Sequence, residues 1–289
     1  MSNFPEKIWF KGKIVPWAEA NIHVMSHALH YGSSVFEGIR SYETPKGPAI
    51  FRLGEHTKRF FNSARMYDLD IGFSPAEIDA ACREVLKVNN LTSAYLRPIA
   101  WRGAGEMMGV AADKNPIRMA VACWTWGNYY GDAKFKGAKL DIAKWKRPSP
   151  ETIPHAAKAA GLYMICTMSK HAAEAKGCSD AMMFDYRGYV AEATGANIFF
   201  VKNGEVHTPL ADAFLNGITR QTVIGMLRDM QIVVHERHIM PEELEGFEQC
   251  WLTGTAAEIT PVGQIGDYNF EVGDLTKRVA TEYEKLVRA

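Results

Sequence analysis

The second half of the chain contains a stretch that decides its fold, AMMFDYRGYVAEATGANIFFVKNGEVHT at residues 181–208. Apolar runs in it alternate with turn residues. Asn-Gly between apolar runs is typical of a two-residue β-hairpin turn, and Arg-Gly occupies the other break. The stretch therefore predicts a β-meander, with strands Ala181–Asp185, Tyr189–Val201 and Glu205–Thr208 and turns at Arg187-Gly188 and Asn203-Gly204.

Further elements flank this meander. Periodicity and turn residues around it predict strands Lys139–Trp145, Ile232–Glu236 and Gln249–Thr253, and helices from about Ala156 to Lys176, Thr219 to Met230 and Asp274 to Arg288.

The first half of the chain reads as strands, then helices, then strands. The segment Ser74-Pro75-Ala76-Glu77 is a capping box with proline at the first helical position, which marks a helix start. This order predicts an α+β unit on a largely antiparallel sheet. Its expected elements are a hairpin of Lys7–Phe10 and Lys13–Val15, strands Val35–Tyr42, Ala49–Arg52, Ala94–Trp101 and Ile117–Trp126, and helices Glu55–Tyr67 and from Ser74.

The glycine-rich segment Gly127–Gly137 separates the two halves and is the best candidate for a linker. It predicts two domains, residues 1–126 and 138–289. With 289 residues in total, both domains are large enough to bury a core.

Composition excludes several classes of protein. Lys plus Arg (33) equals Asp plus Glu (33), so nothing indicates a nucleic acid or an anionic membrane as partner. A hydrophobic content of 47% with 23% charged residues is typical of a folded globular chain. The chain has no apolar run of membrane-spanning length, and Met1–Pro16 has no signal-peptide core, so we expect a cytoplasmic protein. The five cysteines lack C-x-x-C spacing, which predicts reduced, buried thiols and no metal site.

Lys158 lies in the small-residue stretch TIPHAAKAAGLYMICT, residues 152–167. Alanines at 156, 157, 159 and 160 surround it, so its ammonium group is expected to be partly desolvated. Desolvation lowers the pKa of an amine and makes it nucleophilic near neutral pH. A lysine at the start of a helix, with its stem on apolar surface, fits the same stretch, and taken alone the stretch favours that interpretation.

Two small-residue loops are candidate anion sites. Leu215-Asn216-Gly217-Ile218-Thr219-Arg220 opens directly into a predicted helix, where free N–H groups and the helix dipole bind phosphate. An ordinary capped helix start fits the same residues. The turn Thr253–Glu258 follows an apolar strand, and its N–H groups suit either an anion-binding nest or a plain turn.

Three polar side chains on predicted strands are further candidates. Glu192 lies inside an apolar strand, so it either points to solvent or faces inward and needs a cation or a protonated ring nitrogen. Tyr95 and Arg97 stand two residues apart and project from the same face. A phenol beside a guanidinium suits recognition of a carboxylate, although a surface pair would show the same pattern.

Pyridoxal 5′-phosphate is the one cofactor that uses all of these features. It needs a lysine for its Schiff base, an anion cup for its phosphate, an acidic partner for its pyridine nitrogen and a donor near its phenolic oxygen. Lys158, the two loops with a nearby arginine, Glu192 and Tyr163 match these needs.

The segment HALHYGSSVFEGIR, from His27 to Arg40, closely resembles the opening signature of branched-chain amino acid aminotransferases, which are fold-type IV pyridoxal-phosphate enzymes. Later family motifs recur in order across nearly the whole chain: Ile153-Pro154 through Lys158, Glu192 with Gly195 and Asn197, Gly217–Arg220, and Thr253–Val262. The resemblance implies a two-domain α+β fold. In it, 1–126 is the small α+β domain, 127–137 is an interdomain loop that acts as a substrate lid, and 138–289 is a larger, β-barrel-like cofactor domain with flanking helices.

The resemblance also assigns roles to residues. Lys158 becomes the Schiff-base lysine and proton shuttle, Glu192 the partner of the pyridine nitrogen, and Tyr163 the donor to the phenolic oxygen. Arg59 matches the phosphate arginine of the family. The remaining cofactor contacts are Leu215, Gly217, Ile218, Thr219 and Thr255, and the substrate pocket is Tyr31, Phe36, Gly38, Tyr95, Arg97, Trp126, Tyr129, Thr255, Ala256 and Ala257.

The reaction implied is transamination between branched-chain L-amino acids and 2-oxoglutarate by a ping-pong mechanism. Arg97 is the candidate to meet the γ-carboxylate of glutamate, and the family forms dimers or larger homo-oligomers, with Tyr31 reaching into the partner's site. Two positions depart from the family pattern: Asn216 replaces the usual proline, and Leu162 replaces the common asparagine.

Two other kinds of function remain as alternatives. Within the fold, the chain could be a transaminase for D-amino acids or (R)-amines such as aryl amines, or an aminodeoxychorismate lyase. Those relatives generally lack Tyr95-x-Arg97 together with the long signature at 27–40. Outside enzymes, a non-catalytic protein that binds a phosphate ligand is the alternative.

Overall fold

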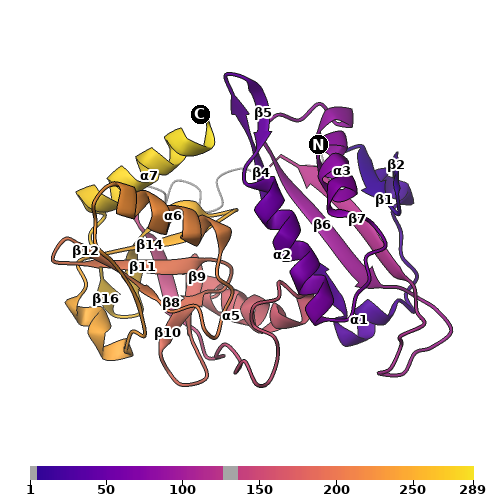
Figure 1. The fold of residues 1–289 in the computed structure, drawn as a ribbon. Coiled ribbons are helices and arrows are strands. Elements are labelled where there is room, and N and C mark those ends of the chain that lie inside the picture. Colours follow the sequence, from indigo (N-terminus) through magenta and orange to yellow (C-terminus); the bar gives the residue numbers. More distant parts are fainter. Residues whose placement is uncertain (1–4, 126–135) are drawn as a thin grey trace. The chain divides into compact units, whose positions relative to one another are not determined.

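The computed structural model describes residues 5–125 and 136–289 (Figure 1). Contacts divide the chain into two compact units: unit 1 is Met1–Trp126, Ala157–Leu162 and Arg288–Ala289, and unit 2 is Gly127–Ala156 and Tyr163–Val287. The segment Ala157–Leu162, which carries Lys158, thus belongs to unit 1, although the sequence analysis included it in the domain 138–289. Most of the expected lid lies outside the described residues, as do Trp126 and Tyr129.

Unit 1 is built on a seven-stranded antiparallel sheet, as predicted. The strand order is β2 (Lys13–Pro16), β1 (Lys7–Phe10), β7 (Ile117–Trp124), β6 (Ala94–Arg102), β4 (Ile39–Thr44) and β5 (Gly47–Ile50), with β3 (Ser34–Phe36) paired to β6.

Two helices pack on this sheet. Helix α3 (Pro75–Val88) contacts β1, β6 and β7, and α2 (Leu53–Met66) contacts α3 and β3. The predicted capping box is present, because Ser74 Oγ accepts from Glu77 N and Glu77 Oε2 accepts from Ser74 N. The short helices η1 (Trp17–Glu19) and α1 (His27–Tyr31) also belong to this unit.

Unit 2 contains a closed six-stranded barrel, in keeping with the β-barrel-like domain that was predicted. The ring runs β10 (Val190–Ala193), β9 (Asp180–Phe184), β8 (Ala138–Ile142), β15 (Glu258–Ile265), β14 (Gln249–Gly254) and β11 (Asn197–Lys202), and β11 pairs back to β10. Strands β12 (Glu205–Pro209) and β13 (Val234–Arg237) extend the sheet beyond β11, and β16 (Tyr268–Asn269) pairs with β15. Closure leaves the ring itself without an exposed strand edge.

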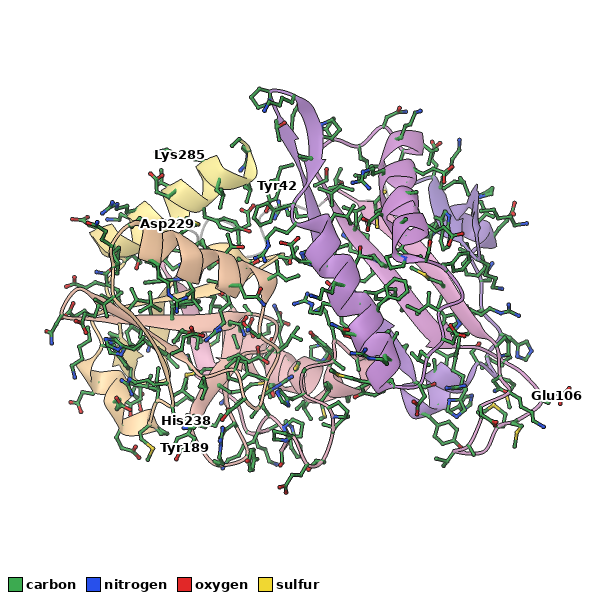
Figure 2. The ribbon with its side chains drawn as sticks, viewed as in Figure 1. Tyr42, Glu106, Tyr189, Asp229, His238 and Lys285 are labelled. Carbon is green, nitrogen blue, oxygen red and sulfur yellow. The ribbon has the colours of Figure 1, made fainter. Side chains whose placement is uncertain are left out.

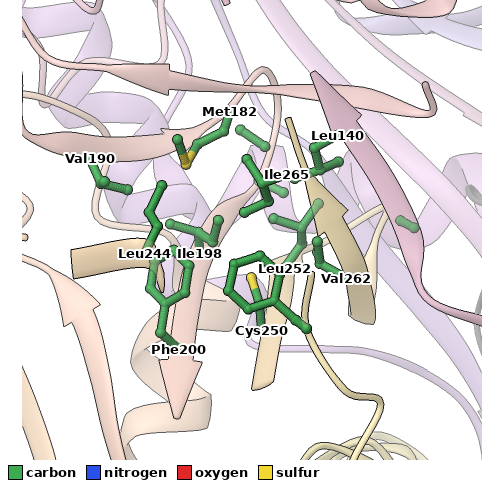
Figure 3. Close-up of a cluster of buried hydrophobic side chains, with 14 of the residues drawn as sticks. Leu140, Met182, Val190, Ile198, Phe200, Leu244, Cys250, Leu252, Val262 and Ile265 are labelled. Atoms are coloured by element: carbon green, nitrogen blue, oxygen red, sulfur yellow. The ribbon is translucent and has the colours of Figure 1, made fainter. Parts of the chain in front are cut away.

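The core of unit 2 fills this barrel (Figure 3). Side chains from successive barrel strands meet there, and each large aliphatic or aromatic side chain removed from water contributes about 1.5–3 kcal/mol. Helices α6 (Ile218–Asp229) and α7 (Asp274–Val287) pack on the β14 side, α5 (Met164–Glu174) packs on β9, and η3 (Pro241–Gly246) contacts β16. The core residues labelled in the figure are Leu140, Met182, Val190, Ile198, Phe200, Leu244, Cys250, Leu252, Val262 and Ile265.

Aromatic stacking also occurs at the surface of unit 2. Tyr189 and His238, labelled in Figure 2, stack with ring centroids 4.7 Å apart. His238 Nε2 also lies 2.8 Å from Asp212, which Arg187 contacts as well.

The predicted start of the helix at Ala156 was wrong. Helix α5 begins at Met164, preceded by the turn η2 (Ala160–Leu162), and Ala159 instead forms an isolated bridge with Val35. This long-range pairing overrides the helix propensity of the alanine run. The strand predicted over Tyr189–Val201 is interrupted by a turn between β10 and β11, and β15 was not predicted.

Two expectations from composition can be compared with the structure. All five cysteines are buried and free, as predicted. Across residues 5–125 and 136–289, no helix combines the length and apolar character that crossing a membrane requires.

Candidate active site

Lys158 is held in unit 1 by its backbone. Its N–H donates to Ser63 Oγ over 2.9 Å, and its carbonyl accepts from Phe36 N over 3.0 Å. These contacts connect the lysine to α2 and β3. The side chain also contacts β3, since Nζ lies 4.9 Å from the centroid of the Phe36 ring.

The predicted desolvation of this amine is present. Burial lowers the pKa of Lys158 from 10.5 to about 8, and the positive charges of Arg59 and Arg97 act in the same direction, against the charge of Glu37. A primary amine with a pKa of about 8 is neutral in roughly one molecule in ten at pH 7, and the neutral form is the nucleophilic one.

Tyr95 and Arg97 lie together on β6, and Arg97 lies over the Phe36 ring. Arg97 Nη2 donates to Tyr95 OH over 3.2 Å, so the prediction that the two side chains share a face of β6 is confirmed. The Arg97 guanidinium carbon lies 4.7 Å from the Phe36 ring centroid. Gly38 is essential to this arrangement, because a Cβ there would collide with Tyr95 OH.

Arg59 contacts a buried carboxylate that sequence reasoning missed. Its Nε and Nη2 donate to Glu37 Oε1 and Oε2 over 2.6 and 2.8 Å, and His56 Nδ1 lies 2.7 Å from Oε2. Glu37 has no exposed surface. Burial alone would raise the pKa of Glu37, but Arg59 and His56 outweigh it and hold this pKa far below its usual range. Glu37 is therefore an ionised carboxylate in a dry environment.

Glu192 is buried on β10 of unit 2 and does not point to solvent. Asn197 Nδ2 donates to its Oε2 over 3.0 Å, and Arg147 Nε lies 3.2 Å from its Oε1. Burial works to lower the pKa of Arg147, but the charge of Glu192 outweighs it and raises this pKa. Arg147 also donates from Nη1 to Cys166 Sγ over 3.0 Å.

Asn197 connects this carboxylate to the predicted glycine loop. Its Nδ2 donates to Leu215 O over 3.0 Å, and its Oδ1 accepts from Gly217 N over 3.1 Å. A Cβ at Gly217 would collide with that Oδ1. Helix α6 begins at Ile218, one residue before the predicted start at Thr219. Its N-cap residue Gly217 has no side chain to cap it, which leaves the first-turn N–H groups to other acceptors.

The remaining predicted residues lie on several elements. Ile218 and Thr219 open α6 and are buried, Tyr163 is the N-cap of α5, and residues 255–257 form the turn from β14 to β15. Unit 1 thus gathers Lys158, Phe36, Gly38, Tyr95, Arg97 and Arg59, and unit 2 gathers Glu192, Leu215, Gly217, Ile218 and Thr219.

Tyr31 differs from the other predicted residues of unit 1. It lies on α1, is 47% exposed, stacks on His27 with centroids 4.5 Å apart, and donates from its OH to Met108 O over 3.0 Å. Its side chain is therefore tied to a surface loop.

Glu205, His207 and His235 have the residue types of a metal site and lie close together on β12 and β13. The two imidazole rings stack with centroids 4.7 Å apart, and Arg237 Nε donates to His207 Nδ1 over 3.2 Å. Lone pairs in the planes of stacked rings do not converge, and the guanidinium repels a cation. This geometry differs from a coordination site, and the expected absence of a metal stays a prediction.

Comparisons with known proteins establish the family. The family model described as amino-transferase class IV matches residues 34–265. A branched-chain-amino-acid aminotransferase of Salmonella typhimurium (strain LT2) is 40% identical over 280 residues, covering 94% of this chain and 90% of that protein. The chain belongs to the branched-chain amino acid aminotransferase family.

Solved structures of the family have the same fold. The T.th. branched-chain amino acid aminotransferase complexed with N-(5′-phosphopyridoxyl)-L-glutamate is 41% identical, with a TM-score of 0.94, over 99% of this chain and 95% of that one. The same enzyme complexed with 4-methylvaleric acid is 40% identical, with a TM-score of 0.93, over 99% and 95% of the two chains. These similarities confirm the predicted fold-type IV architecture and transamination as the reaction of this chain. A pyridoxal-phosphate-related cofactor is implied by the family.

Proposed function

We propose that the protein transfers amino groups between branched-chain L-amino acids and 2-oxoglutarate, with pyridoxal 5′-phosphate as cofactor. The observation that carries the proposal is the Lys158 amine. Its pKa is lowered to about 8, it lies 4.9 Å from the Phe36 ring, and Arg97, which donates to Tyr95 OH, lies at the same ring. An amine, an apolar surface and a carboxylate-binding pair are what this reaction requires of a protein.

The donor set fits the cofactor. Lys158 provides the amine that binds an aldehyde, Arg59 and the α6 N-terminus provide donors for a phosphate, and Glu192 provides a buried carboxylate for a ring nitrogen. Tyr163 is assigned to the phenolic oxygen. Leu215, Ile218, Thr219 and Thr255 are assigned to the remaining ring and phosphate contacts.

When bound, pyridoxal phosphate supplies an aldehyde for the amino group and a ring that takes up negative charge from the substrate Cα. Lys158 Nζ would accept the proton from the substrate Cα in one direction of amino transfer and return a proton to Cα in the other. Glu192 holds a proton on the ring nitrogen, and Asn197 and Arg147 keep the Glu192 carboxylate oriented. Both substrates use the same groups in turn, so the kinetics are ping-pong.

Substrate selection is assigned to Phe36, Tyr95 and Arg97 of unit 1 and to the Thr255–Ala257 turn of unit 2. Phe36 offers an apolar surface for a branched side chain, and Tyr95 with the Thr255–Ala257 turn holds the α-carboxylate. Arg97 meets the γ-carboxylate of glutamate or 2-oxoglutarate. The T.th. relative supports this dual use, because its structures contain both a phosphopyridoxyl-glutamate and 4-methylvaleric acid.

The assembly proposed is a homodimer or a multiple of it. Its support is an apolar patch on unit 1 around α1 and the loop that Tyr31 and His27 contact. Val24 and Val110 in this patch are 67% and 82% exposed, and Met25, Leu29 and Met107 are exposed as well. An apolar patch of this kind marks an interaction site. Analytical ultracentrifugation tests the assembly: Val110→Asp should shift the protein towards monomer, and a wild type that sediments as a monomer would refute it.

The proposed location is the cytoplasm, in keeping with five free, buried thiols. Cell fractionation tests it, and recovery in an extracytoplasmic fraction would contradict it.

An amine-donor panel tests the substrate assignment. The holoenzyme is assayed with 2-oxoglutarate and L-leucine, L-valine, D-alanine or (R)-1-phenylethylamine. Activity with the first two is expected, and activity confined to the last two would favour a D-amino acid or amine transaminase instead. A protein that binds the cofactor and transfers no amino group would be a binding protein.

A further inference from the structure

Glu37 holds the Arg59 side chain by both of its oxygens. Arg59 Nε donates to Oε1 over 2.6 Å and Arg59 Nη2 donates to Oε2 over 2.8 Å. A guanidinium is a rigid plane, so a two-point contact fixes both its position and its direction. Nη1 of Arg59 takes no part in this contact. Because the guanidinium is rigid, the contact nevertheless fixes the direction in which Nη1 points.

The carboxylate that provides this contact is itself fixed. Besides Arg59, Glu37 Oε2 lies 2.7 Å from His56 Nδ1 and accepts from Gly38 N over 3.2 Å. His56 and Arg59 lie three residues apart on α2, so the helix presents both to one point. Glu37 has no exposed surface, so bulk water does not reach these bonds.

Stability alone is a weak reason for such an arrangement. Replacing a buried ion pair by apolar side chains of similar volume is often neutral or stabilising. A long arginine side chain, in contrast, loses rotamer entropy when it is ordered. If Glu37 has ordered it beforehand, a ligand of Arg59 does not bear that cost when it binds.

We propose that Glu37 is a positioning residue, which presents Arg59 to the phosphate group of the cofactor. The inference rests on the proposed function, in which Arg59 is a phosphate ligand. Glu37 has a second, opposing effect, because its negative charge weakens the attraction between Arg59 and a phosphate dianion. The positioning effect outweighs this one, so loss of Glu37 reduces the preference for a phosphorylated cofactor.

The experiment compares two cofactor forms. Dissociation constants of the cofactor-free protein are measured for pyridoxal 5′-phosphate and for pyridoxal, which lacks the phosphate, and their ratio is the phosphate selectivity. Glu37→Gln should lower this selectivity about tenfold, which corresponds to about 1.4 kcal/mol, with little change for pyridoxal. Arg59→Gln should lower it at least as much, and the double variant no further than Arg59→Gln alone.

Glu55→Gln is the matched control. Glu55 lies on α2, is largely exposed and accepts from Arg52 over 2.9 Å, so its loss removes an ion pair of the same helix without touching Arg59. It should leave the selectivity unchanged. Should Glu37→Gln not fold, Glu37→Asp keeps the charge, withdraws the carboxylate by one methylene and should lower the selectivity about threefold, or about 0.6 kcal/mol.

A second measurement separates positioning from general disruption. Glu37 raises the pKa of Lys158, so Glu37→Gln should shift the titration of this amine to lower pH in the cofactor-free protein. Unchanged or increased selectivity in the Glu37 variant that folds, or equal losses for both cofactor forms, would overturn the proposal. A wild type that binds pyridoxal phosphate no better than pyridoxal would instead refute the proposed function itself, and the inference with it.

Discussion

Lys158 Nζ lies 4.9 Å from the centroid of the Phe36 ring. The ring gives the amine an apolar neighbour, and the carbonyl of Lys158 accepts from the N–H of the same phenylalanine. The amine is thus fixed by both side chain and backbone in a place where its charge is poorly solvated. This relationship makes the titration of Lys158 a property of the fold that can be measured.

Replacing Lys158 by Met should stabilise the cofactor-free protein near neutral pH. Burial lowers the pKa of Lys158 from 10.5 to about 8, so between these values the unfolded chain binds the proton and the folded chain does not. Folding stability of the wild type therefore rises with pH across this window. At pH 7 we expect a Tm increase of about 2–4 °C for Lys158→Met, or ~1 kcal/mol, and this gain should shrink as the pH rises from about 8 to 10.5. Lys139→Met, at an exposed position of β8, is the control, and an equal gain there would contradict the explanation.

Gly38→Ala should impair substrate binding. The added Cβ collides with Tyr95 OH and displaces the side chain assigned to the substrate carboxylate. We expect kcat/KM to fall by at least tenfold, or about 1.4 kcal/mol. Gly54→Ala, where a Cβ meets nothing within 4 Å, should keep full activity and gain up to about 1 kcal/mol of helix stability. Steady-state kinetics of both variants test this prediction. A fully active Gly38→Ala enzyme would show that Tyr95 does not bind the substrate carboxylate.

Arg97→Gln should change the choice between acidic and apolar substrates. The Arg97 side chain is the cation assigned to the distal carboxylate, whereas a branched alkyl chain has no charge to meet. The KM for 2-oxoglutarate should rise at least tenfold more than the KM for 4-methyl-2-oxopentanoate, since a charged hydrogen bond contributes about 1.5–3 kcal/mol. Arg118→Gln, at an exposed position of β7, should change neither. Equal rises for both substrates would show that Arg97 serves the α-carboxylate or the fold.

Asn197→Ala should weaken the region around Glu192. The amide makes one hydrogen bond to the Glu192 carboxylate and two to the loop before α6. Its loss leaves a buried charge with one partner fewer, so the free energy of unfolding should fall by about 2–3 kcal/mol. Urea denaturation measures this, with Asn269→Ala on β16 as an exposed control. A variant as stable as wild type would mean that water replaces the amide.

Local sequence signals predicted the parts of the fold that depend on neighbouring residues. The capping box at Ser74 and the start of α6 after Gly217 are determined by the few residues that form them. The start of α5 is different, because Ala159 pairs with Val35 across 124 positions of sequence, and no local pattern contains that contact. Alanine-rich sequence around Lys158 therefore suggested a helix that the fold does not form.

For the candidate site, the sequence predicted the residues that lie in motifs and missed the residues that contact them. Motifs identified Lys158, Glu192 and Arg59 because each belongs to a recurring segment. The partners Glu37 and Arg147 were missed, since a carboxylate between Phe36 and Gly38 and an arginine in a basic connector have no pattern of their own. One signal was present. Glu37 falls within the predicted apolar strand Val35–Tyr42, where a carboxylate needs cations. His56 and Arg59 are spaced to share one face of a helix.

The covalent link to Lys158 is the most direct measurement of the central claim. The protein is incubated with pyridoxal 5′-phosphate, reduced with sodium borohydride, digested and mapped by mass spectrometry. We predict one phosphopyridoxyl group per chain, on Lys158, and a Lys158→Ala variant that neither carries the group nor transfers amino groups. A phosphopyridoxyl group on another lysine, or turnover near the wild-type rate in Lys158→Ala, would contradict the account.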